Sequence, residues 1–140
     1  MKNSPICVDA SIVASLLLQS SSQVQLYWQK WTDEGRAIIC PALLHFEVVN
    51  VLHQYWRHDQ LPAEIVQKLI DVLHNLPLQV QTHPELHVRA AILAQQLKLG
   101  ATYDAHYVAL ALCYDAEFWT LDARLHRRFT EILPIVHLVT

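Results

Sequence analysis

Short apolar runs alternate with longer helical patterns along almost the whole chain, and this alternation constrains the fold most. Runs of strand length occupy residues 5–8, 37–40, 78–80, 117–121 and 135–139. Between them, helical patterns cover 10–18, 20–33, 43–57, a segment starting at Pro62, 84–99, a segment from 102 or 103, and 122–129. Strands that are apolar throughout are buried on both faces, and parallel strands need crossover segments. The order therefore predicts an α/β fold in three layers, with a mainly parallel sheet between helices.

The composition is that of one globular domain, which we expect to span residues 1–140. Of its 140 residues, 53% are hydrophobic and 16% are charged, and only two are glycine, so long flexible linkers are not expected. The net charge of −3 argues against a protein that binds nucleic acid through a net positive charge. It leaves room for a local basic patch at Arg124, His126, Arg127 and Arg128.

The cysteines and the N-terminal segment bear on the compartment. The three cysteines are far apart, lie in apolar surroundings and form no C-x-x-C pair, which favours free thiols in a reducing compartment. Lys2 precedes an apolar stretch to Leu18, but Pro5 and Asp9 interrupt it, which weighs against a signal peptide. We therefore expect a cytoplasmic protein that does not span a membrane.

Four acidic residues stand where apolar elements end or present their apolar faces: Asp9, Glu47, Asp104 and Asp122. Asp9 and Asp122 each follow a predicted strand, so both are expected at the carboxyl edge of the sheet, where ligands bind in such folds. A buried carboxylate is costly unless it is paired or binds a metal. Four of them suggest one anionic pocket for Mg2+ or Mn2+.

Each acid also has a purely structural interpretation. Asp9 and Asp122 are suitable helix N-caps, and Asp104 lies in a first helical turn, where the helix dipole favours negative charge. Glu47 is harder to explain, because helical spacing puts it on the apolar face of Leu44 and Val51 without an obvious partner. A salt bridge or an exposed helix end is the alternative for Glu47.

Four local strings around these acids resemble the PIN-domain ribonucleases, including the VapC-type toxins of toxin–antitoxin pairs. They are VDASIV at 8–13, PALLHFEVVNVL at 41–52, GATYDAHYVALA at 100–111 and WTLDARL at 119–125. Their order and spacing fit, and the resemblance spans nearly the whole chain. A departure is Phe118-Trp119 before Asp122, where the family often has a small aliphatic residue. Asp115 and Glu117 are the nearest candidates for a further acid, and we expect both on a turn away from the site.

The resemblance implies a PIN-like domain and assigns roles by position. Asp9, Glu47, Asp104 and Asp122 become the catalytic and metal-binding set for Mg2+ or Mn2+. Ser11 and Thr120 become hydroxyl neighbours, and Asn50 a polar neighbour of Glu47. The implied reaction is endonucleolytic hydrolysis of RNA that leaves a 5′-phosphate and a 3′-hydroxyl, with an antitoxin protein as a possible partner.

An acidic pocket repels RNA, so basic groups are expected beside it. Arg124, Arg127 and Arg128 follow Asp122 on one short predicted helix and could contact neighbouring phosphates. The alternative is a solvated surface helix. The sequence contains no G-x-S-x-G string and no cysteine beside an obvious base, so it does not indicate a protein nucleophile.

Two other functions compete with the nuclease. One is a catalytically silent PIN-like module that binds RNA or protein. The other is a phosphoryl-transfer domain with Asp9 as nucleophile, which generally needs a second aspartate where this chain has Ser11.

Histidines and aromatic residues are abundant in the chain. His83 and His87 lack a third zinc ligand at a recognisable spacing, so we expect surface histidines. The large aromatics are expected in the core or in an interface, either a homodimer contact or a groove for an antitoxin helix, with stacking on RNA bases as the alternative: Trp28, Trp31, Tyr55 and Trp56.

Overall fold

The computed structural model describes residues 3–140, so Lys2 lies outside the described residues. Five strands form one sheet in the order β3-β2-β1-β4-β5, and every pairing is parallel. Their bounds are β1 Ile6–Val8, β2 Ile38–Cys40, β3 Leu78–Val80, β4 Glu117–Thr120 and β5 Val136–Leu138. All five predicted strands are confirmed, most of them a residue shorter at one or both ends.

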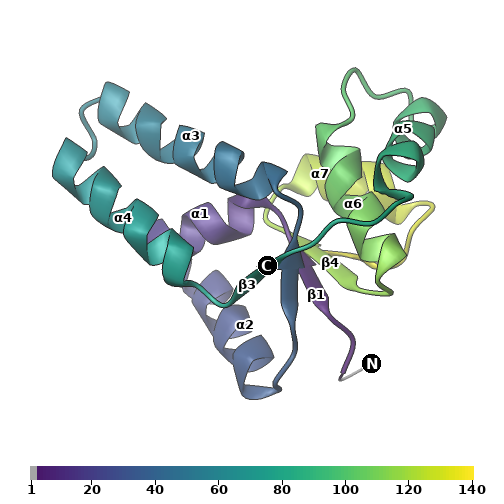
Figure 1. Ribbon diagram of the computed structural model, residues 1–140, viewed down its shortest axis with the longest axis horizontal. Coiled ribbons are helices and arrows are strands. Elements are labelled where there is room, and N and C mark those ends of the chain that lie inside the picture. The colour runs from purple at the N-terminus through teal and green to yellow at the C-terminus, as the bar shows by residue number, and fades with distance from the viewer. Residues whose placement is uncertain (1–2) are drawn as a thin grey trace.

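Seven helices lie on the two faces of the sheet among the described residues (Figure 1). On one side are α1 Ala10–Leu18, α2 Ser22–Asp33, α3 Leu43–Arg57 and α4 Ala63–Asn75; on the other are α5 Leu86–Gln96, α6 Tyr103–Cys113 and α7 Ala123–Thr130. The three-layer α/β/α fold is therefore confirmed. The helices that follow β1 and the helix that follows β4 lie on opposite faces of the sheet, although β1 and β4 are neighbours in it, and the carboxyl ends of such strands border a crevice.

Helix caps explain most of the differences between predicted and observed helix bounds. The α2 helix begins at Ser22 rather than Ser20, because the Ser21 hydroxyl accepts a hydrogen bond from the Val24 amide at 3.3 Å. The helix predicted over 84–99 is shorter, Leu86–Gln96. The sequence predicts that this helix ends at Gly100, but the left-handed residue that follows it is Lys98, with φ 54°.

The α3–α4 hairpin extends from the rest of the molecule (Figure 1). The helical spacing of the sequence predicts one apolar stripe on α3, formed by Leu44, Val48, Val51 and Tyr55. In the structure the buried positions are Leu44, Val48 and Leu52. The sequence spacing predicts Ile65, Leu69, Val72 and Leu73 as the apolar face of α4, and this prediction is partly wrong. Leu69 and Leu73 pack against the core, but Ile65 and Val72 are 37% and 47% exposed, and Val66 and Ile70 pack in their place.

The aromatic residues beside β4 explain the departure at Phe118-Trp119. Phe118 is fully buried on one face of the sheet. Trp119, on the opposite face, packs its ring on Tyr27 and Trp31 of α2, with centroid distances of 4.7 and 5.5 Å. The large side chains thus fill the space between the sheet and α2. The same packing confirms Trp31 as a core residue, whereas Trp56 is 46% exposed.

A partly buried ion pair lies at the amino-terminal edge of the sheet. Glu117 begins β4 instead of lying on a turn, and the Arg36 guanidinium donates to its carboxylate at 2.8 Å. Asp115 does lie on a turn, with φ 51°. Both acids are at the edge opposite the carboxyl ends of the strands, so neither joins the predicted site.

Cys7 and Cys40 are buried and Cys113 is partly exposed, all as free thiols. Within residues 3–140, no helix has both the length and the apolar character required to cross a bilayer.

Candidate active site

Asp9 lies at the carboxyl end of β1 and is only 5% exposed. One carboxylate oxygen, Oδ1, accepts hydrogen bonds from the Ser11 hydroxyl at 2.6 Å and from the Ile12 amide at 3.3 Å. The other, Oδ2, accepts from the Thr120 hydroxyl at 2.6 Å. The N-cap role expected for Asp9 is thus present, but it engages one oxygen, while the other faces the neighbouring strand β4.

Burial raises the pKa of Asp9 to about 6. Hydrogen bonds from Ser11, Thr120 and Ile12 lower it in part, and the negative charge of Asp104 raises it further. The site therefore holds a carboxyl group whose charged form is disfavoured in the absence of a cation.

Ser11 and Thr120 connect the ends of β1 and β4. The Ser11 hydroxyl accepts from the Leu121 amide, and the Thr120 hydroxyl accepts from the Asp122 amide, each at 3.0 Å. Both hydroxyls also donate to Asp9. They therefore orient the Asp9 carboxylate and fix the backbone that leads into Asp122.

Glu47 lies on α3, half-buried, with a partner that the sequence did not suggest. The hydroxyl of Tyr107, a residue of α6 that is 1% exposed, donates to Glu47 Oε1. Burial is the largest cause that raises the pKa of Tyr107, and its bond to Glu47 raises it further. The tyrosine therefore stays protonated and holds one Glu47 oxygen from the opposite layer of the fold.

Asp104 and Asp122 are exposed at the rim of the site. Burial of part of its surface raises the pKa of Asp104, and the charge of Asp122 adds to the increase, while Arg128 opposes it. Asp122 also caps α7, since its Oδ1 accepts from the amides of Arg124 and Leu125 at 2.9 and 3.2 Å. Electrostatic coupling thus connects Asp9 to Asp104 and Asp104 to Asp122.

The remaining predicted polar residues lie farther out. Asn50 is exposed on α3, and the hydrogen bonds of residues 3–140 do not include its side chain. Arg124, Arg127 and Arg128 are exposed on α7 and line, with Glu131, an open polar cavity of about 550 Å³.

The donor set fits a hard divalent cation by its chemistry, because it consists of carboxylates and hydroxyls around a carboxyl group with a raised pKa. The side chains do not already form a cage: within the described part of the chain, no three His, Cys, Asp or Glu residues stand close enough to hold one ion. Binding would therefore require the exposed side chains of Asp104 and Asp122 to turn inward.

Tyr107 was missed because it lies among the apolar residues of α6. Its signal was available in principle, since a buried tyrosine hydroxyl normally finds a hydrogen-bond partner. The sequence could not indicate that the partner would be Glu47, 60 positions away.

The fold and the site together define a parallel α/β domain with acidic side chains at the carboxyl edge of its sheet. The PIN domain family model matches residues 6–129, and the chain belongs to the PIN-domain family. Ribonuclease VapC3 of Pyrobaculum aerophilum is 27% identical over 129 residues, which cover 91% of this chain and 97% of that protein. The resemblance carried by the four strings is confirmed.

Proposed function

We propose that this PIN-domain protein is a metal-dependent endoribonuclease that hydrolyses RNA phosphodiester bonds in the cytoplasm. The observation that carries the proposal is the position of three acids at one edge: Asp9, only 5% exposed, follows β1, Asp122 follows the neighbouring strand β4, and Asp104 lies in the first turn of α6. The similarity to a protein named Ribonuclease VapC3 supports RNA as the substrate.

Asp9, Glu47, Asp104 and Asp122 would hold Mg2+ or Mn2+. Such a cation, when bound, supplies a Lewis acid that stabilises charge on the phosphate and lowers the pKa of water near it. Carboxylates are hard oxygen donors suited to these ions.

The other residues of the site orient the four acids or contact the RNA. Ser11 and Thr120 orient Asp9 by donating to its two oxygens, and Tyr107 orients Glu47. Arg124, Arg127 and Arg128 offer positive charge for the phosphates beside the scissile one. Asn50, three residues after Glu47 on α3, adds a polar group at the outer end of the site.

An exposed apolar stripe on α3 supports a protein partner. Phe46, Val49 and Trp56 are 76%, 36% and 46% exposed, and their spacing puts them on one helical face. We propose that this stripe forms a homodimer contact. The proposal extends to a toxin role, in which an antitoxin protein binds and silences the enzyme.

The alternative is a catalytically silent PIN-like module that binds RNA or protein. It is favoured by one observation: both Asp9 oxygens already accept hydrogen bonds, and no preformed metal cage exists among the described residues. Such a module would bind without turnover.

Cleavage of mixed RNA substrates in Mg2+, Mn2+ or EDTA tests the nuclease. The parent should cut in either metal and not in EDTA, and the products should carry 5′-phosphates. Asp104→Asn should lower the rate at least about 100-fold, as expected when a group acting in the transition state is lost. Asp59→Asn is the matched control, because Asp59 is an exposed acid in a turn after α3 and should leave the rate unchanged. Equal rates for Asp104→Asn and the parent would reject the proposed role of this acid.

A further inference from the structure

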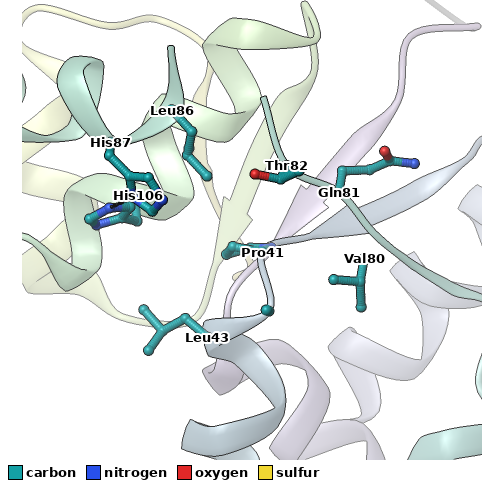
Figure 2. Close-up of a pocket in the computed structure, with 9 residues that line it drawn as sticks. Pro41, Leu43, Val80, Gln81, Thr82, Leu86, His87 and His106 are labelled. Atoms are coloured by element: carbon teal, nitrogen blue, oxygen red, sulfur yellow. Dashed lines mark hydrogen bonds between the residues drawn. The ribbon is translucent and has the colours of Figure 1, made fainter. Parts of the chain in front are cut away.

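The residues at the ends of β2 and β3 line a cavity that none of the sequence motifs explains. It has a volume of about 400 Å³ and lies between the start of α3, the segment after β3, and helices α5 and α6 (Figure 2). Pro41 and Leu43 follow β2, and Val80 ends β3. All strands are parallel, so the cavity opens at the same edge of the sheet as Asp9.

The cavity and the arginines of α7 lie on opposite sides of the acids. The strand order puts β2 and β3 on one side of β1 and puts β4, which leads into α7, on the other. Neighbouring strands are about 5 Å apart. Leu43 is one helical turn before Glu47 on α3. A single RNA strand that crosses this edge would thus meet the arginines, the acids and the cavity in order.

The lining of the cavity suits a base and not a phosphate. None of its nine lining residues is Lys, Arg, Asp or Glu, so no formal charge of a fixed sign attracts an anion. The walls are largely apolar and include Leu86, which is buried, and Val80, which is 51% exposed. The volume is within the range of sites for small organic ligands.

A pair of histidines supplies the polar edge. His106 Nδ1 is 2.8 Å from the Thr102 carbonyl oxygen, which only accepts, so this nitrogen carries a hydrogen. The tautomer assigned from this contact leaves His106 Nε2 as an acceptor, and His87 Nδ1, 2.9 Å away, donates to it. His87 Nε2 is then left as an acceptor on an exposed ring that lines the cavity. Every RNA base presents an N–H donor on its pairing edge that could meet such an acceptor.

We propose that this cavity is a base-binding pocket that holds one unstacked nucleobase of the RNA substrate, close to the scissile phosphate. The inference rests on the proposed function for the identity of the ligand. The apolar wall formed by Leu43, Val80 and Leu86 covers the face of the base, and His87 accepts a hydrogen bond from its edge. The pocket thereby sets which phosphate of a single strand reaches the acids.

Binding of short fluorescent oligoribonucleotides in EDTA tests the pocket without any cleavage. One base at a time is replaced by an abasic position along the strand. The parent should lose about tenfold in affinity at one position, as expected for the loss of one stacked base. The Trp side chain of Val80→Trp should fill the cavity. This variant should therefore bind the intact RNA about as weakly as the parent binds the RNA that is abasic at that position. Its affinity should be the same for the intact RNA and for that abasic RNA.

Two further variants keep the test specific. Val88→Trp is the matched control, because Val88 is 63% exposed on α5, outside the lining of the cavity, and this variant should behave like the parent. His87→Ala should weaken binding of the intact RNA several-fold but leave binding of that abasic RNA unchanged. Thermal melting of each variant shows whether it is folded.

The outcomes separate this inference from the nuclease proposal. The pocket is rejected if no abasic position weakens binding, or if folded Val80→Trp distinguishes intact from abasic RNA as the parent does. If the pocket is rejected but the protein still cuts RNA, the nuclease proposal is retained. A position-specific loss in EDTA from a protein that cuts no RNA in Mg2+ or Mn2+ would instead support the pocket and reject the nuclease.

Discussion

At the scale of single residues, the Asp9 carboxyl destabilises the metal-free fold at neutral pH. Its pKa in the folded state is about 6, against 3.8 for the ordinary group. Because the folded state binds the proton more tightly, stability falls as pH rises through this window. Asp9→Asn in EDTA should therefore raise the melting temperature by several degrees at pH 8, and the gain should disappear by about pH 4.

The asparagine can keep most of the hydrogen bonds, since its oxygen accepts from Ser11 and its amide donates to the Thr120 hydroxyl. Mg2+ should stabilise the parent more than the variant. The account of Asp9 is contradicted if the variant melts below the parent by the same margin at every pH. This measurement of stability is independent of catalysis.

Tyr107 is a positioning residue for Glu47. Tyr107→Phe removes only the hydroxyl that donates to Glu47 and keeps the buried ring. The variant should bind Mn2+ about tenfold more weakly, as expected when a group that orients a ligand is lost, and should cut RNA more slowly. Tyr103→Phe is the control, because Tyr103 is 60% exposed on the same helix. If the Mn2+ affinity of the Tyr107 variant is unchanged, the positioning role is rejected and the tyrosine only packs in the core.

At the scale of elements, α7 combines two tasks at its two ends. Its first turn is capped by Asp122, and its last turn carries Arg127 and Arg128. Arg127→Ala should weaken RNA binding and reduce the slope of log affinity against log salt by about 0.7, the value for one lost phosphate contact on a single strand. Because Arg127 is exposed, stability should not change. If the salt slope is unchanged, Arg127 does not contact a phosphate, and α7 is a solvated surface helix.

The elements also show what the sequence could predict and what it could not. Strands and caps follow from local patterns, so the amino-acid sequence alone was enough to predict Asp9 and Asp122 at the sheet edge. The exposed face of α4 did not follow, because Ile65 and Val72 fit the apolar period, and only the packing of α4 in the folded structure leaves them exposed. The pairing of His87 with His106 depends on the packing of α5 on α6 and has no local signal.

The same limit applies to the candidate site. Ser11 and Thr120 were predicted as hydroxyl neighbours, and both contact Asp9. The link from Glu47 to Tyr107 joins residues of two different layers, so no pattern in either helix could indicate it. The contact from Thr120 to Asp9 joins residues 111 positions apart and was expected from the family resemblance, whereas the contact from Tyr107 to Glu47 is evident only in the packed structure.

At the scale of the whole molecule, the α3 stripe predicts self-association. If Phe46, Val49 and Trp56 form a homodimer contact, Trp56→Glu should convert a concentration-dependent dimer into a monomer in analytical ultracentrifugation, because a charge would be buried in the interface. Leu26→Glu on α2 is the control, since Leu26 is 65% exposed away from that stripe. If the parent stays monomeric at high concentration, the homodimer is rejected and the stripe is expected to bind a different partner, such as an antitoxin.

That residues 1–140 act as one PIN-like domain also stays a prediction.

We propose that four carboxylates from four segments of the chain form one cation site. Its most direct test is an anomalous difference map from crystals of the parent soaked in Mn2+ and measured at the manganese absorption edge. A shared cation site predicts a peak bounded by Asp9, Glu47, Asp104 and Asp122 in crystals of the parent, and no peak there in crystals of Asp9→Asn. A peak elsewhere, or no peak at a Mn2+ concentration at which the same protein cuts RNA, would contradict it.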